Sequence, residues 1–107
     1  LQYLDLRNTL VNDKTISGIE KLNGLRMVNL ENAAITDISL NVLEALNLET
    51  LAIEGTDITA QGLLDSKILG NEASQQRGSL IISADHYSDE ELAALSIKFD
   101  LTATTSN

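Results

Sequence analysis

Apolar residues recur along this chain in a fixed phrase, apolar-x-x-apolar-x-apolar, in which x is usually polar. The phrase begins at Leu1, Leu25 and Leu48. Its second and third apolar positions are two residues apart, so in an extended segment they point to the same side. Each phrase is followed by a second apolar set at helical spacing, as at Leu40 and Leu43. The pattern therefore predicts a strand, a turn and a helix in each unit.

A fourth unit becomes visible when a longer connection is allowed before it. Leu80 and Ile82 then take the second and third apolar positions, and the unit opens at Arg77. The polar stretch 70–79 is bracketed by glycines and is predicted to be a loop. The expected units are residues 1–24, 25–47, 48–76 and 77–100, followed by a frayed tail at 101–107.

Polar residues at fixed places support the same division. Thr9, at the ninth place of its unit, is expected to hydrogen-bond backbone groups where the chain leaves the strand. Thr36 and Ser88 stand where helix N-caps belong, and Ser88 with Glu91 makes the spacing of a capping box. Ser66 interrupts the third apolar set, which predicts a weaker helix there.

The shared pattern can be written L-x-x-L-x-L-x-x-T-x-I-T-D-x-x-L-x-x-L, and it resembles the leucine-rich repeat family over residues 1–99. Departures are Ala33 and Asp85 at the ninth place, Ser66 in the third helix, and Arg77 as a polar opener. The resemblance implies an α/β solenoid with parallel strands on the concave side and helices on the convex side. Leu1 is already a core position, so we expect a fragment of a longer repeat protein, or another chain covering this edge.

Composition narrows the classes of partner. The formal net charge is −9, from 7 basic and 16 acidic residues. Such a charge repels nucleic-acid backbones and anionic lipid headgroups, so neither partner is expected. The chain has no cysteine, and no apolar stretch approaches the roughly 18 residues needed to span a bilayer.

Candidate chemistry is sparse. His86 is the single histidine, so a triad or metal site built on several histidines is impossible within this chain. An acidic cluster surrounds it, but that cluster lacks the spacing and glycine turn of a calcium loop and is explained by favourable charge at a helix N-terminus. We therefore predict no catalytic residue, no metal site, no cofactor and no enzyme activity. An enzyme in which the repeats only deliver substrate to another domain is the remaining catalytic alternative.

The concave sheet face is the more promising surface, because strand residues that do not enter the core project from it. Tyr3 and Met27 should stack in one column and offer an amphipathic and an adaptable contact. Arg7 is expected to pair with Glu31 on the next rung. The predicted partner-binding residues are Tyr3, Asp5, Arg7, Met27, Asn29, Glu31, Thr50 and Glu54.

These features predict a protein-interaction scaffold whose partner carries basic residues. A structural alternative is an assembly segment that docks through its open N-terminal edge onto further repeats or another subunit. The plainest alternative is a sheet face that is merely solvated.

Overall fold

The fold was analysed in a computed structural model, which describes residues 2–22, 24–46, 48–69 and 78–104. Strands and helices alternate along the chain. The strands are β1 (Tyr3–Asp5), β2 (Met27–Asn29), β3 (Thr50–Ala52), β4 (Ser79–Ser83) and β5 (Asp100–Thr104). The α-helices are α1 (Leu40–Glu44), α2 (Ala60–Asp65) and α3 (Asp89–Lys98). Three 3-10 helices, η1 (Ile16–Lys21), η2 (Asp37–Ser39) and η3 (Ala84–His86), complete the described elements.

The five strands form one parallel sheet whose spatial order follows the chain, β1-β2-β3-β4-β5. The second apolar position of every unit lies in the same row. This row runs through Leu4, Val28, Leu51, Leu80 and Leu101, each paired in register with the next. The prediction of an α/β fold with the repeated phrases on adjoining parallel strands is confirmed.

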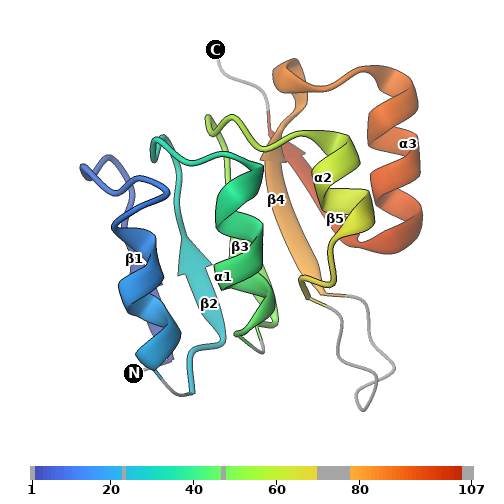
Figure 1. The fold of residues 1–107 in the computed structure, drawn as a ribbon. Helices are drawn as coiled ribbons and strands as arrows, with labels where there is room; N and C mark the ends of the chain where they lie inside the picture. The colour runs from blue at the N-terminus through green and yellow to red at the C-terminus, as the bar shows by residue number, and fades with distance from the viewer. Residues whose placement is uncertain (1, 23, 47, 70–77, 105–107) are drawn as a thin grey trace.

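Figure 1 shows η1, α1, α2 and α3 on one face of the sheet, whereas η3 directly follows the end of β4. Leu80 and its row neighbours Val28 and Leu51 are fully buried, and they belong to one apolar cluster with helix residues such as Leu43 and Leu63. Because side chains alternate along a strand, the residues between them point to the other face. That second face, which no described helix covers, is called the helix-free face below.

The described structure differs from the expected units in three respects. Residues 101–104 were expected to fray, but they form β5 and pair with β4, so that expectation is wrong for these four residues. The first helical segment is a 3-10 helix. Ser66 ends α2 instead of weakening it, and its hydroxyl donates to the carbonyl of Leu63. Leu1, Arg77 and most of the predicted loop 70–79 lie outside the described residues, whereas Ser79 belongs to β4.

Polar side chains fix each turn as the sequence predicts. The hydroxyls of Thr9 and Thr56 each donate a 2.7 Å hydrogen bond to a carbonyl three residues earlier. Thr36 accepts from the backbone of Ile38 as an N-cap, and Ser88 forms the full capping box with Glu91. These bonds satisfy backbone groups that the ends of strands and helices would otherwise leave without partners.

Two aspartates clamp neighbouring units together. Asp13 accepts hydrogen bonds from the backbone N–H of Thr36 at 2.9 Å, from its hydroxyl at 2.8 Å, and from the hydroxyl of Ser39. One unit later, Asp37 accepts the equivalent two bonds from Thr59, at 2.7 and 2.6 Å. Burial raises the pKa of Asp13, but the hydrogen bonds from Ser39 and Thr36 outweigh it and hold that pKa below its usual range.

A different set of bonds joins the third unit to the fourth. Ala60 stands where Asp13 and Asp37 stand in the first two units, so no carboxylate clamp forms. Instead, the Tyr87 hydroxyl donates a 2.8 Å bond to the carbonyl of Ile58, and burial raises its pKa to about 12. The Lys98 ammonium donates to three carbonyl oxygens at the end of α2, those of Leu63, Leu64 and Ser66.

Leu51→Ala should lower the free energy of unfolding by about 2–5 kcal/mol, because it leaves a cavity in the centre of the buried row. Urea unfolding followed by circular dichroism measures the change. Leu10→Ala is the matched control, since the Leu10 side chain is 97% exposed, and it should shift stability by less than about 0.5 kcal/mol. Equal losses in the two variants would contradict the central position of this row.

Asp13→Ala should destabilise the fold by about 1–3 kcal/mol at neutral pH, because Thr36 and Ser39 lose their shared acceptor. The folded pKa of Asp13 is depressed, so its contribution is present above the unfolded pKa of about 3.9 and is lost as the pH falls through the folded value. The difference in the free energy of unfolding between wild type and variant should therefore narrow when urea unfolding is measured below about pH 4. Asp57→Ala, at an exposed carboxylate, should show no such gap at either pH.

Candidate functional site

The helix-free face presents its side chains in columns that cross the strands. In the first column lie Tyr3, Met27, Thr50, Ser79 and Asp100. In the second lie Asp5, Asn29, Ala52, Ile81 and Thr102. Two residues further along each of the first three strands, Arg7, Glu31 and Glu54 begin the third column, where backbone bonds continue the ladder. All eight residues predicted to bind a partner therefore lie together on this face.

At the β1 end of the sheet, the first column is the most apolar of the three. Tyr3 and Met27 are register partners, as expected from the sequence. The Tyr3 side chain is 46% exposed, whereas Met27 and Thr50 are half-buried. The rigid tyrosine ring would lose little conformational freedom on contact with a ligand. The flexible methionine side chain beside it can adapt its shape to that ligand.

Two side chains of the second column hold the backbone where β1 and β2 end. The Asp5 carboxylate accepts from the backbone N–H of Arg7 at 3.0 Å, and the Asn29 amide oxygen accepts from that of Glu31 at 3.1 Å. Asn29 is only 9% exposed, so its main role is to hold the backbone rather than to meet a partner. Ala52, the next residue of the column, is almost fully buried. In the middle of this column, on β2 and β3, the side chains are therefore buried, whereas Asp5 and Thr102 at its two ends are exposed.

Arg7 does not pair with Glu31, and this expectation is wrong. Its guanidinium instead forms an ion pair of 2.9 Å with Asp5, two residues earlier on the same strand. The side-chain hydrogen bond from Arg7 lowers the pKa of Asp5. Asp5 and Arg7 lie two residues apart on the same face of a short extended segment, so their side chains are adjacent. Glu31 makes no ion pair with Arg7, but its charge adds to that of Asp5 in raising the pKa of Arg7.

The site extends further than the sequence analysis predicted, because β5 adds a fifth strand to it. The Thr104 hydroxyl donates 2.7 Å to the Glu54 carboxylate and 3.1 Å to the carbonyl of Ile82. The signal for β5 was the alternation of Phe99, Leu101 and Ala103 with polar residues, which is typical of a strand.

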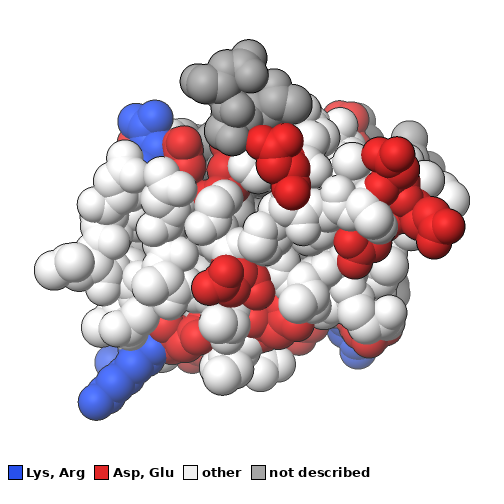
Figure 2. Space-filling view, turned by 90° about the horizontal axis from the view of Figure 1, so that it is seen from above, with Lys and Arg blue, Asp and Glu red and all other residues white. Residues whose placement is uncertain are grey.

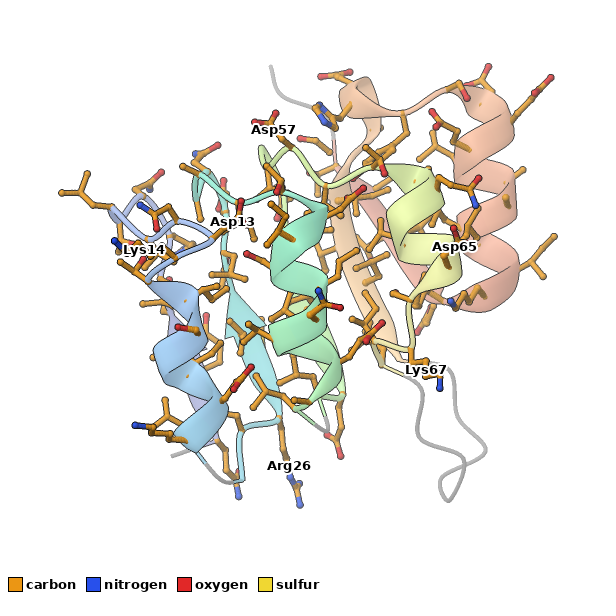
Figure 3. The ribbon with its side chains drawn as sticks, in the orientation of Figure 1. Asp13, Lys14, Arg26, Asp57, Asp65 and Lys67 are labelled. Carbon is orange, nitrogen blue, oxygen red and sulfur yellow. The ribbon has the colours of Figure 1, made fainter. Side chains whose placement is uncertain are left out.

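Negative charge dominates the end of the molecule where the strands finish. Figure 2 looks onto this end, and in that view acidic side chains spread over the surface while basic ones lie only near its margin. Figure 3 shows Asp13 and Asp57 at the same end and Arg26 at the opposite one, where β2 begins. A field of this sign attracts cationic ligands and speeds their association at low ionic strength.

No group of histidine, cysteine or carboxylate side chains among the described residues is arranged to hold a metal ion. His86 packs edge-on against Tyr87, with ring centroids 5.2 Å apart. The acidic residues Asp89, Glu90 and Glu91 occupy the first turn of α3, where the helix dipole favours negative charge. Within the described part of the chain, no helix has the length and apolar character to cross a bilayer.

The chain was compared with known protein families, curated proteins and solved structures. No protein-family model, no curated protein and no solved structure matches the chain. The functional argument therefore depends on the geometry and charge of the helix-free face.

Gly55 shapes the turn that follows Glu54, and its replacement tests that turn. Its φ of +74° is left-handed, and an added Cβ would lie 2.1 Å from the Asn32 side-chain oxygen. Gly55→Ala should therefore cost at least about 1–2 kcal/mol in thermal or urea unfolding. Gly18→Ala is the matched control, because a Cβ there meets nothing within 4 Å. Equal stability of the two variants would show that the turn at position 55 accepts a Cβ without strain.

Proposed function

We propose that this chain is a leucine-rich-repeat-type binding module that receives a basic segment of a partner protein on its helix-free face. The observation that carries the proposal is the gathering of the eight predicted residues into three columns on a face that no described helix covers. Neighbouring strands space the successive residues of each column about 4.8 Å apart. A ligand lying across the strands would meet one rung after another.

The charges on this face favour a cationic ligand. Glu31 and Glu54 lie on neighbouring strands in the third column, where the ladder bond from Asn32 to Glu54 joins those strands. The single described ion pair on the face occupies Arg7 with Asp5, so the one arginine of the columns is already neutralised. The overall charge of −9 adds a long-range attraction for basic partners.

The first column supplies the apolar part of the contact. Aromatic side chains at the centre of an interface carry a large share of binding energy, and methionine adapts its shape to the ligand. Tyr3 and Met27 are register partners, and the next column contains the buried residues Asn29 and Ala52. We therefore expect the recognised segment to place an apolar residue here and a lysine or arginine near Glu31.

The repeat-family part of the proposal is supported by equivalent bonds at equivalent positions. Thr9 and Thr56 make the same turn bond, and Asp13 and Asp37 make the same clamp to the following unit. Such unit-to-unit repetition is typical of repeat proteins in which each unit packs mainly on its neighbours. Their rigid surfaces bind through shape and spacing.

Peptides selected from a random twelve-residue display library on the immobilised chain provide the test. Enriched peptides should be rich in lysine and arginine, and fluorescence anisotropy should give weaker binding to the double variant Tyr3→Ala/Met27→Ala. Loss of these two contacts should reduce affinity by about tenfold or more, which corresponds to about 1.4 kcal/mol. Glu31→Gln/Glu54→Gln should flatten the salt dependence of the remaining affinity.

Glu20→Gln/Glu90→Gln is the matched control, because it removes two exposed carboxylates from the helical side of the molecule without touching the columns. Its affinity should stay within about twofold of wild type, since screened distant charges contribute little. Peptides that bind all of these variants equally, or that show no excess of basic residues, would refute the proposal.

A further inference from the structure

β5 is the last strand of the described sheet, and its outer backbone edge pairs with no other described strand. β5 pairs with β4 through five residues, Asp100–Thr104, whereas each pairing among the first four strands involves three. The backbone N–H of Asp100 donates to the carbonyl of Gly78, on the β4 side. Because backbone direction alternates along a strand, Thr102 also faces β4, and the N–H and C=O groups of Leu101 and Ala103 point outward. Such an edge is a template for another strand.

The opposite edge is protected in a way that β5 is not. β1 contains only three residues. The N–H of Arg7, just beyond β1, is already bonded to the Asp5 carboxylate, and the same carboxylate holds the Arg7 guanidinium. Short length and charged pairs are common devices that prevent strand addition at an edge. β5 carries neither a basic residue nor a proline.

Side chains beside the β5 edge define what an added strand would contact. On the helix side, Leu101 is half-buried and Ala103 is exposed, while their counterparts on β4, Leu80 and Ile82, are fully buried. The apolar layer is therefore only partly covered at this end. On the helix-free side, the exposed neighbours are Asp100 and Thr102, which are acidic and polar.

We propose that the β5 edge binds an extended, basic segment of a partner protein as a sixth strand of the sheet. Aliphatic side chains of the segment pack beside Leu101 and Ala103, and the alternating lysine or arginine side chains face Asp100. Charge selects this occupant over a second copy of the chain, because a second copy brings its own Asp100 and a further net charge of −9 to the edge. The added strand gains main-chain bonds from the edge and specificity from its alternating side chains.

A ten-residue peptide of alternating lysine and valine is the probe. Titrated into the isotopically labelled chain, it should produce saturable NMR shifts in the amides of Leu101 and Ala103. Ala103→Pro removes an outward N–H without breaking the ladder to β4, and it should weaken the affinity by about tenfold or more. Ala103→Val retains the N–H and should bind within about twofold of wild type.

The controls separate strand addition from simple charge attraction. A peptide of alternating lysine and proline carries the same charge but cannot pair as a strand, and it should not shift the β5 amides. Circular dichroism should show both Ala103 variants folded, and Asp100→Asn provides a second variant that weakens binding without altering the backbone.

Equal affinity of wild type and Ala103→Pro, or no saturable shift with the lysine and valine peptide, would overturn the proposal. A concentration-dependent dimer that disappears in Ala103→Pro would overturn it too, by assigning the edge to a second copy. These outcomes differ from failure of the proposed function, because Tyr3→Ala/Met27→Ala should leave the β5 shifts intact.

Discussion

In-register burial of one aliphatic side chain on each strand is the constraint from which the rest of this structure follows. Leu4, Val28, Leu51, Leu80 and Leu101 form one row, and the three central members are fully excluded from water. A slip of one residue in any strand would turn its apolar set toward solvent and its polar set toward the helices. Register therefore determines which residues reach the helix-free face as well as which residues fill the core.

Polar side chains add a second level of control, because they fix where each strand turns away from the sheet. Threonine hydroxyls, the clamping aspartates and the left-handed residues Asn8, Asn32 and Gly55 recur at equivalent places. Asn32 also donates its side-chain amide to Asn8 at 2.9 Å. With the turns held in this way, strand residues that face solvent can vary without loss of the fold. Folding thus depends on the buried and turn positions of each unit, and the proposed binding on its exposed strand positions.

Sequence periodicity was sufficient to predict the parallel strands, the row of buried residues, the turn bonds and the N-caps at Thr36 and Ser88. It also predicted the placement of Tyr3 beside Met27, because register follows directly from aligned repeats. It failed at Arg7 and at β5, for different reasons. The Arg7 guanidinium forms its ion pair with Asp5, two residues earlier in the sequence, and not with Glu31 on the next strand. No helix follows β5 among the described residues, so β5 lacked the second half of the pattern by which the other strands were found.

The junction between α2 and α3 breaks the repetition. Units one to three are joined by carboxylate clamps, whereas Tyr87 and Lys98 reach across this boundary to main-chain carbonyls. In a linear array, cooperativity is transmitted only through contacts between neighbours. In this chain, the boundary with its own kind of bond separates the first three units from the fourth. We expect partial opening to begin there, with the first three units and the β4–α3–β5 end exchanging their amide hydrogens as two separate blocks.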